Sequence, residues 1–458
     1  MRQIQGEHTA ANGRVARYAI IATMPETVNL TSEIKRQLPS EMVDFMRWAG
    51  EEAAQQGRSL YLVGGVVRDL FLQRPNFDMD LVVDSDAISL ARRLAKEVDA
   101  KLTIHARFNT ARIRWDRWSV DLATVRSETY ERPGALPKVG PGTLDTDLLR
   151  RDFTINAMAI ELTASRYGRL IDVYGGQADL EGKFIRVLHE NSFTDDATRI
   201  WRAIRYEQRL VFRLEPVTRK LLRRDIPMLD TISGDRIRHE LELVLKEERP
   251  EKSLRRAGEL GVLARLHPSL RGDGWLARKF RQARRLSLDG QPSPELYFAL
   301  LGYSLNPKEA DELIAYLRLS RTLARDLRDT AALKGWLDAL EGQGLKPSGI
   351  YDLLNGFSPT AIAAARIAAG SATARRHMAL YLNKLRQVKL AVTGDDLVKM
   401  GFPAGPKLKE ILQRLLEARL DGEVKNKECE LEMAANEFGG SLAGRPVGAN
   451  RGQEEKCQ

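Results

Sequence analysis

The sequence predicts an α+β fold, in which a small mixed sheet with flanking helices is followed by an all-helical remainder. Two short apolar runs bounded by turn residues, Leu60–Val63 and 81–83, are typical of buried strands. Apolar and polar side chains alternate in three further stretches, which indicates half-buried strands at 101–105, 110–115 and 119–124. From Pro216 onward the apolar residues recur at helical spacing instead.

Length and charge narrow the class of protein. A chain of 458 residues is too long for one compact domain, so we expect several units. The net charge of +10 suggests a polyanionic partner. The two cysteines, Cys429 and Cys457, offer no disulfide framework and no cysteine-based zinc site, which fits a reducing cytoplasm. We see no signal peptide and no apolar stretch long enough to cross a membrane, and therefore expect a cytoplasmic protein.

Two amphipathic segments are expected to cover the predicted sheet. Residues 38–56 and 86–98 both carry apolar side chains at helical spacing. Residues 1–35 are polar and only weakly periodic, so we expect a poorly ordered lead there.

The first apolar run leads into two glycines and a predicted helix at 66–72. Gly64 and Gly65 let the backbone approach a ligand without a Cβ in the way. The free N–H groups of the helix N-terminus would face that ligand, and Arg68 adds a cation suited to bidentate phosphate binding. This stretch therefore predicts a phosphate site.

Asp78 and Asp80 are two residues apart, so on a strand both carboxylates point to the same face. They would repel each other unless a cation such as Mg²⁺ lay between them, and a phosphate site followed by such a pair is the layout of two-metal nucleotidyl transfer. The alternative is that both lie in a solvated turn. Asp121, in a neighbouring predicted strand, is a candidate third carboxylate; the alternative is an ion pair with Arg114 or Arg126.

With these residues, the stretch 62–83 resembles the first signature of the class II tRNA nucleotidyltransferase and bacterial poly(A) polymerase family. The resemblance implies a head domain of the polymerase-β nucleotidyltransferase type. The segment 150–159, Arg-Arg-Asp-Phe-Thr-Ile-Asn-Ala-Met-Ala, resembles the second signature, and 172–186 resembles the third. In the second, Arg151 is expected to face the triphosphate, and Asp152 and Asn156 the ribose hydroxyls. The alternative is an Arg-Asp pair that caps a strand.

Between the first two signatures, residues 130–147 are rich in proline and glycine. We expect a long loop here, and long loops in compact domains are usually functional. The family has a flexible loop at this place, whose presence is associated with addition of the terminal A.

Asp196, Arg199, Arg202 and Arg205 recur at three-residue steps, which on a helix gives one drifting stripe. The alternative is a salt-bridged surface helix. The resemblance implies that Asp196 and Arg199 hydrogen-bond the Watson–Crick edge of the incoming base. Arg202 and Arg205 would then make nearby phosphate or structural contacts.

The helical remainder contains arginine-rich segments at 320–334 and 361–389. These are either solvated faces or contacts to tRNA phosphates. We expect the following organisation: a lead at 1–35, a nucleotidyltransferase head at 36–190, a neck with a base-selecting helix at 191–255, a body at 256–330, a tRNA-binding tail at 331–435 and a disordered end at 436–458.

The resemblance implies an enzyme that adds C and A to the tRNA 3′ end from CTP and ATP, without a nucleic-acid template. Mg²⁺ would be held by Asp78 and Asp80. Alternatives in the same family are a CC-adding-only enzyme, an A-adding-only enzyme and a poly(A) polymerase. A non-catalytic RNA-binding protein would not need the intact aspartate pair. A nucleotidyltransferase for small substrates would not need the basic helical tail. The sequence leaves the oligomeric state open.

Overall fold

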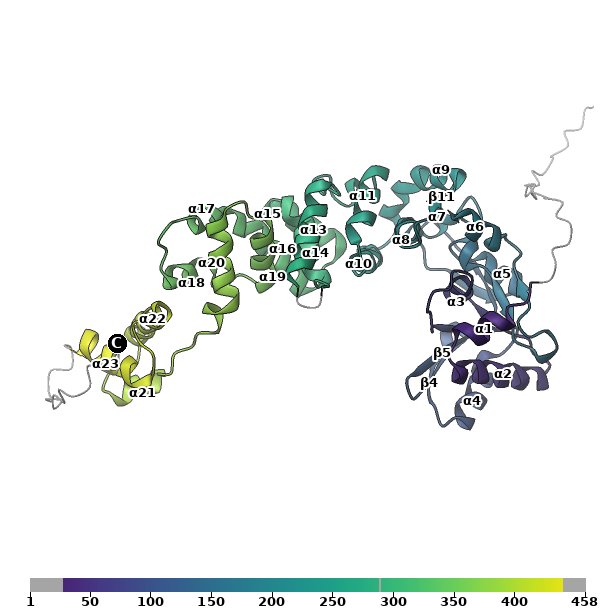
Figure 1. The fold of residues 1–458 in the computed structure, drawn as a ribbon, viewed down its shortest axis with the longest axis horizontal. Helices are drawn as coiled ribbons and strands as arrows, with labels where there is room; N and C mark the ends of the chain where they lie inside the picture. Colours follow the sequence, from purple (N-terminus) through teal and green to yellow (C-terminus); the bar gives the residue numbers. More distant parts are fainter. Residues whose placement is uncertain (1–27, 288–289, 440–458) are drawn as a thin grey trace, which may run out of the picture. The chain divides into compact units, whose positions relative to one another are not determined.

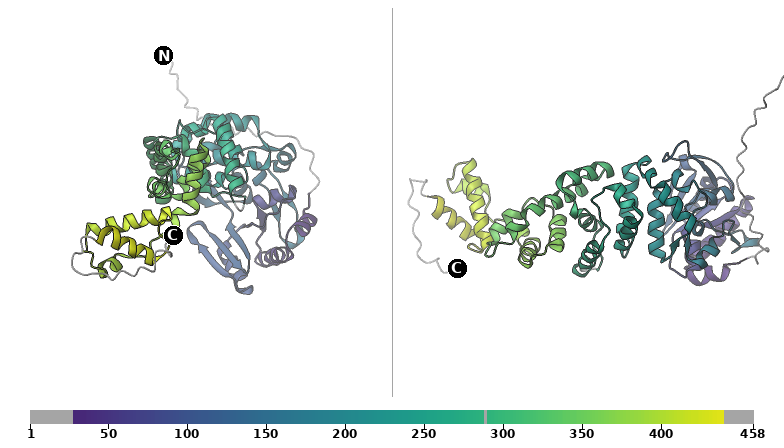
Figure 2. Two further views of the ribbon diagram at one scale, coloured as in Figure 1. Left: turned by 60° about the vertical axis from the view of Figure 1, so that its left-hand side comes forward. Right: turned by 90° about the horizontal axis from the view of Figure 1, so that it is seen from above.

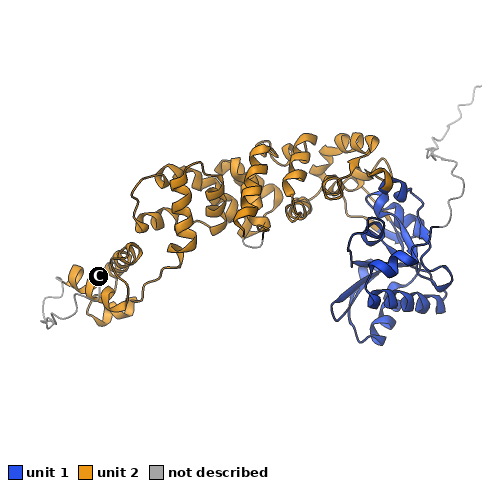
Figure 3. Cartoon of the chain, in the orientation of Figure 1, with its two compact units in different colours: residues 1–127, 139–180 blue, residues 128–138, 181–458 orange. Residues whose placement is uncertain are grey.

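The structure is a computed structural model that describes residues 28–287 and 290–439. The chain divides into two compact units, which Figure 3 shows in different colours. Unit 1 contains residues 1–127 and 139–180, and unit 2 contains residues 128–138 and 181–458. We describe each unit by itself.

Unit 1 is built on a seven-stranded mixed sheet, so the predicted α+β class is confirmed. The strand order is β3 (Lys101–His105), β4 (Thr110–Trp115), β5 (Trp118–Thr124), β2 (Met79–Val83), β1 (Leu60–Val63), β8 (Ala159–Glu161) and β9 (Leu170–Ile171). Strands β2 and β5 run parallel, and the other neighbours in this sheet run antiparallel. This order brings the second apolar run directly beside the strand that contains Asp121.

Helices α2 (Ser40–Gln55) and α4 (Ala87–Glu97) lie where the apolar spacing predicted them. Helix α4 packs across β3, β4 and β5 with its apolar stripe, and the Asp86 carboxylate caps its N-terminus by accepting from the Ser89 backbone N–H at 3.1 Å. Figure 1 shows α2 and α4 beside the strands of the sheet. One face of these strands is thus buried under helices, and the alternate side chains lie on the other face.

The predicted poorly ordered lead is wrong for residues 31–35. Helix α1 (Thr31–Gln37) begins there, because Ile34 is fully buried and anchors it. Residues 1–27 lie outside the described part of the chain.

The predicted long loop at 130–147 contains regular structure. Strand β7 (Lys138–Pro141) lies within this range and pairs with β6 (Arg126–Thr129), which immediately precedes the range, and α5 (Leu144–Leu149) begins in the same range. Thr143 and Thr146 make a reciprocal capping box at the start of this helix, which proline and glycine content alone did not reveal.

Unit 2 is helical apart from a short parallel pair, β10 (Phe184–Ile185) and β11 (Arg213–Leu214), and the ends of β6 and β7 that fall within residues 128–138. Its helices are α7 (Ser192–Asp195), α8 (Thr198–Leu210), α9 (Pro216–Asp225), α10 (Gly234–Leu245), α11 (Pro250–Leu260), α12 (Val262–Leu266), α13 (Gly274–Leu286), α14 (Pro294–Leu301), α15 (Pro307–Leu317), α16 (Arg321–Leu333), α17 (Leu337–Leu340), α18 (Pro347–Leu354), α19 (Pro359–Ala368), α20 (Ala372–Asn383), α21 (Gly394–Lys399), α22 (Pro406–Asp421) and α23 (Lys427–Phe438). The all-helical remainder is therefore confirmed, whereas its division into neck, body and tail stays a prediction.

The last helices of unit 2 carry an apolar core of their own. Helices α22 and α23 lie side by side in both views of Figure 2 and bury Ile411, Leu415 and Ala434 between them. The predicted disordered end is wrong for residues 436–438, which belong to α23, and residues 440–458 lie outside the described part. None of the helices in residues 28–287 and 290–439 has both the length and the apolar character needed to cross a membrane.

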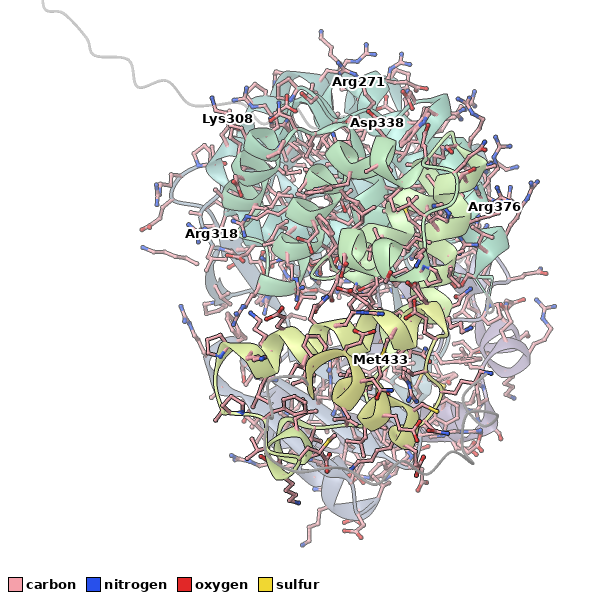
Figure 4. The ribbon with its side chains drawn as sticks, turned by 90° about the vertical axis from the view of Figure 1, so that its left-hand side faces the viewer. Arg271, Lys308, Arg318, Asp338, Arg376 and Met433 are labelled. Atoms are coloured by element: carbon pink, nitrogen blue, oxygen red, sulfur yellow. The ribbon has the colours of Figure 1, made fainter. Side chains whose placement is uncertain are left out.

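The basic helices of unit 2 have many local partners. In α16, Arg325 pairs with Asp329 and Arg328 with Asp311, as expected for a solvated, salt-bridged face. Four other basic side chains are exposed on this unit and are labelled in Figure 4: Arg271, Lys308, Arg318 and Arg376. Contact of any of them with tRNA stays a prediction.

Candidate active site

Three polar side chains lie in one row across the sheet of unit 1. Asp80 of β2 is directly opposite Asp121 of β5, and Asp121 is directly opposite Arg112 of β4. Residues paired in this way point to the same face of a sheet. The residue after each aspartate, Leu81 and Leu122, is buried on the helix side. The row therefore lies on the face away from α4.

The Arg112 guanidinium makes a bidentate salt bridge to the Asp121 carboxylate. Its Nε and Nη2 donate to the two carboxylate oxygens at 2.6 Å each. An ion pair was the alternative that the sequence left open, but the expected partners Arg114 and Arg126 are wrong. Arg114 lies opposite Ser119 instead, because the register places residue 112 across from Asp121.

The Asp80 carboxylate is difficult to ionise. Protein atoms crowd it, although part of the residue is exposed, and this burial raises its pKa to about 6. Repulsion from Asp121 and Asp78 acts in the same direction, while attraction to Arg151 opposes it. Asp78 itself precedes β2 and is exposed. The structure thus brings the three predicted aspartates into one electrostatic cluster.

Gly64 touches the centre of this cluster. A Cβ added there would lie 3.1 Å from Oδ2 of Asp80 and 3.3 Å from Nη1 of Arg151. The glycine also has a φ of +83°, which other residues rarely adopt. The backbone conformation favours glycine at this position, and a Cβ would in addition force Asp80 and Arg151 to shift by a few tenths of an ångström.

The Arg151 side chain lies near Gly64 and Asp80, and one of its hydrogen-bond donors has no partner among the described residues. Its Nη2 donates to Oδ2 of Asp147 at 3.2 Å, but its Nε is buried without a hydrogen-bond partner among the described residues. Buried polar atoms without a partner cost free energy, and an anion beside the guanidinium would supply one. This fits the predicted contact with a triphosphate.

Asp147 is a residue that the sequence reasoning missed. It is fully buried and accepts hydrogen bonds from both Arg150 and Arg151. Its position three and four residues before these arginines is the signal that could have found it.

The predicted phosphate and ribose residues form a buried polar network instead of an open surface. Arg68 donates to both oxygens of Asp69, at 2.9 and 2.7 Å, and to Oδ1 of Asn156 at 2.7 Å. Asn156 donates in turn to Oδ1 of Asp152 at 2.9 Å, and Asn76 donates to Asp69 at 2.7 Å. Arg68, Asp69, Asp152 and Asn156 are only 4 to 7 % exposed. Direct contact of Arg68 with phosphate stays a prediction, and a Cβ added at Gly65 would lie 3.4 Å from its guanidinium.

A pocket of about 440 Å³ opens over the row of polar side chains. Its lining includes Asp80, Asp121, Arg112, Arg150 and Arg151. Its volume is in the range of small-molecule sites. Two of the three predicted carboxylates, Asp80 and Asp121, and the arginines beside them are therefore gathered at one cavity of unit 1.

The base-selecting residues predicted by the resemblance lie in unit 2. Asp196 is not on a helix, because α7 ends at Asp195 and α8 starts at Thr198. Its Oδ1 accepts hydrogen bonds from the Thr198 N–H at 2.9 Å and hydroxyl at 2.6 Å, which fastens it to the start of α8. The predicted continuous stripe from 196 to 205 is therefore wrong at its first residue.

The three arginines of α8 differ in their surroundings. Arg199 is buried and donates to Oγ of Ser192 at 2.7 Å. Arg205 is also buried and pairs with Glu240 at 3.5 Å, and Arg202 pairs with the same glutamate at 3.7 Å. For Arg202 and Arg205 these contacts agree with the structural alternative that the sequence left open.

Two further residues approach Asp196, and the sequence reasoning missed both. Arg236 of α10 donates to Oδ1 of Asp196 at 2.8 Å and to the Gly134 carbonyl at 3.4 Å. Burial and Glu128 raise the pKa of Tyr130 to about 12, and the charges of Arg199 and Asp196 also act on this phenol. Residues of the segment 128–138 thus lie beside Asp196 within unit 2.

The chemistry of the donor set fits a divalent cation. Burial first, and then repulsion from Asp121 and Asp78, raise the Asp80 pKa, and a cation between the carboxylates would relieve the repulsion. Among the residues that the structure describes, no three His, Cys, Asp or Glu side chains form a ready metal cluster. Both oxygens of Asp121 accept hydrogen bonds from Arg112.

Comparison with family models assigns most of the chain. Residues 60–186 match the model of the poly(A) polymerase head domain, and residues 211–272 match an RNA- and SrmB-binding site of polymerase A. Residues 292–435 match domain 2 of tRNA nucleotidyltransferases. The first match contains all the site residues of unit 1 described above.

Curated relatives agree with these models. An A-adding tRNA nucleotidyltransferase of Geobacter sulfurreducens is 36% identical over 88% of this chain and 48% of its own length. One of Halalkalibacterium halodurans is 30% identical over 90% of this chain and 96% of its own. One of Aquifex aeolicus is 33% identical over 80% of this chain and 45% of its own. The chain thus spans about half the length of two of these relatives.

Solved structures share the fold. A CCA-adding enzyme in an apo form has a TM-score of 0.78 at 31% identity, covering 90% of this chain and 99% of that one. The Thermotoga maritima CCA-adding enzyme complexed with tRNA has a TM-score of 0.71 at 30% identity, covering 89% and 98%. On the combined evidence of models, relatives and structures, the chain belongs to the family of tRNA nucleotidyltransferases and poly(A) polymerases.

Proposed function

We propose that this protein transfers a nucleotide from a nucleoside triphosphate to the 3′ end of a tRNA, and that it adds the terminal A to a tRNA ending in CC. The observation that carries the transfer is the convergence of Asp80 and Arg151 on Gly64, where an added Cβ would lie 3.1 and 3.3 Å from their side chains. The glycine gives access, the carboxylate a metal ligand and the arginine an anion partner.

The reaction joins the RNA 3′ hydroxyl to the α-phosphate and releases pyrophosphate. Arg151 would hold the triphosphate, because its buried Nε has no hydrogen-bond partner in the described part of the chain and Asp147 fixes its orientation. Asp152 and Asn156, locked in the network with Arg68, would position the ribose. Asp78 and Asp80 would hold Mg²⁺, which when bound supplies Lewis-acid activation of the hydroxyl and neutralises charge on the leaving group.

Base selection would fall to the residues around Asp196. Its Oδ1 is occupied by Thr198 and Arg236, so Oδ2 is the oxygen available to accept from the exocyclic amine of adenine. Arg199 would supply the complementary donor. No nucleic-acid template is needed, because a carboxylate and a guanidinium together complement a Watson–Crick edge.

The proposal that the enzyme adds only A, and not both C and A, rests on the relatives named above. The sequence led us to expect addition of both C and A, with an A-only enzyme as an alternative. The A-adding enzymes at 36%, 33% and 30% identity favour that alternative. Full CCA addition remains the second candidate, because solved CCA-adding enzymes match at a TM-score of 0.78 and 31% identity.

The test uses three tRNA transcripts that end at the discriminator, at C and at CC. Each is incubated with Mg²⁺ and labelled CTP, ATP or both, and is then sized on a gel beside the Asp78→Ala/Asp80→Ala variant. We expect a single A on the CC transcript and no extension of the other two. Three added nucleotides on the first transcript would favour the CCA enzyme, and long A tails a poly(A) polymerase. Absence of any product, as in the double variant, would refute transfer and leave an RNA-binding protein.

A further inference from the structure

The open face of β3 and β4 carries two cations that the proposed chemistry does not use. Lys101 of β3 lies directly opposite Arg114 of β4. Residue alternation places both on the same face as Arg112, and the cross-strand row joins Arg112 to Asp121 and Asp80. The two cations and the carboxylates therefore share one face of the sheet in unit 1.

This pair is unfavourable for the sheet itself. Like charges directly opposite each other on antiparallel strands are destabilising. Lys101 and Arg114 are both exposed, and within the described residues neither side chain has a hydrogen bond or ion pair that would offset the repulsion. A polyanion over both side chains would remove that cost.

Protection of the sheet edge can explain Lys101 but not Arg114. Strand β3 is the edge strand, and a lysine there discourages pairing with other chains. Strand β4 is bonded on both sides, to β3 and to β5, so edge protection gives no reason for Arg114. Arg112 on the same strand is held by Asp121, which leaves Arg114 as the cation open to a ligand.

The spacing favours a strand of RNA as the polyanion. Neighbouring strands of a sheet are ~4.8 Å apart, so β4 and β3 lie roughly 10 and 14 Å from Asp80. Gly64 follows β1, which lies on the other side of β2 from β5 and β4, so a triphosphate seated at this glycine would leave β4 and β3 open. An RNA strand with its 3′ hydroxyl at Asp80 would extend over β4 and β3 with its next phosphates.

We propose that Arg114 and Lys101 bind the phosphates just upstream of the RNA 3′ end. This inference rests on the proposed function, because it names the part of the substrate that this face receives. The guanidinium fork of Arg114 suits a bidentate phosphate contact, and Lys101 adds a point charge beside it. Both contacts are independent of sequence and position the strand without selecting the base that is added.

The experiment measures equilibrium binding of a CC-ending tRNA transcript by fluorescence anisotropy, and KM for the transcript and for ATP separately. The variants are Lys101→Gln, Arg114→Gln and their combination. The matched control is Arg92→Gln, which removes an exposed cation from α4 on the opposite side of the sheet. We expect the dissociation constant and KM for RNA to rise about fivefold for each single change, and the salt slope of binding to fall by about 1. KM for ATP should stay unchanged.

Every other result overturns the inference. An equal loss in Arg92→Gln would assign the effect to net charge, a rise in KM for ATP would assign the cations to the triphosphate, and unchanged RNA binding would leave them without a role. Removal of one charge from a repelling pair should leave Tm unchanged or higher, so a fall in Tm together with weaker binding would indicate a structural role. Binding needs no catalysis, so a wild type that binds RNA without extending it refutes the proposed function and still permits the comparison among variants.

Discussion

Arg236 and Asp196, 40 residues apart in the sequence, are joined by a hydrogen bond of 2.8 Å. Oδ1 of Asp196 also accepts two hydrogen bonds from Thr198, and among the described residues its Oδ2 has no partner. The carboxylate is therefore fixed in orientation, with one oxygen engaged and the other available.

Replacement of Arg236 by Gln should reduce discrimination between nucleotides, because the Asp196 carboxylate could then rotate. We expect the ratio of kcat/KM for ATP to that for CTP to fall by roughly tenfold, as one hydrogen bond in a recognition site is worth about that much. Arg238→Gln on the same helix is the control, since Arg238 pairs with Asp235 and Glu242 and not with Asp196. Equal selectivity in Arg236→Gln and the wild type would contradict this role.

Gly64→Ala should abolish activity with little loss of fold. The added Cβ would meet Asp80 and Arg151 at 3.1 and 3.3 Å, and it would also strain a φ of +83°. We expect kcat to fall at least a hundredfold, whereas the strain alone costs about 1–2 kcal/mol. Gly57→Ala is the matched control, because Gly57 has a φ of +68° and nothing within 4 Å. Urea unfolding and single-turnover rates measure the two effects, and comparable activity in both variants would refute the close approach.

Asp147→Asn should lower the stability of the fold and weaken binding of the nucleotide. The buried carboxylate holds Arg150 and Arg151, and its neutralisation leaves two cations without their anion. We expect a loss of about 2–3 kcal/mol in the free energy of unfolding and a raised KM for ATP, since Arg151 would lose its orientation. Asp145→Asn, at an exposed position of the same helix, should change the unfolding free energy by less than about 1 kcal/mol. Equal stability of the two variants would argue against the role of Asp147.

His189 should make unit 2 sensitive to acid. Burial and the charge of Arg199 lower its pKa to about 4, and Asp195, 3.9 Å away, does not reverse this. The unfolded chain binds a proton near pH 6.5 while the folded chain does not, so stability is lost as the pH falls from about 6.5 to about 4. Tm measured between pH 7.5 and 4.5 should fall less in His189→Gln than in the wild type.

Strands β1, β3 and β4 could be predicted to the residue, because alternation and burial follow directly from the order of side chains. The hairpin of β6 and β7 could not. Proline and glycine there indicated a loop, and only cross-strand pairing turned part of it into a sheet. A local pattern of residues describes one strand at a time, whereas strand pairing also depends on the sequence of the neighbouring strand.

The same limit applies to the site. Asp78, Asp80 and Arg151 were found from local motifs; Asp80 and Arg151 line one pocket of unit 1, and the charge of Asp78 acts on Asp80. The partner of Asp121 was mistaken, because register decides between Arg112 and Arg114 and the sequence does not contain the register. Arg236 was missed for a similar reason, since it reaches Asp196 from a distant helix.

The buried network of Asp152, Asn156, Arg68, Asp69 and Asn76 has a consequence for binding thermodynamics. These side chains already make their hydrogen bonds to one another, so their rotamers are fixed when the protein folds. A nucleotide that binds beside them meets groups whose conformational entropy is already lost. Its affinity is therefore reduced less by ordering of the protein, and the heat capacity change on binding should be small, as expected for a site assembled in advance.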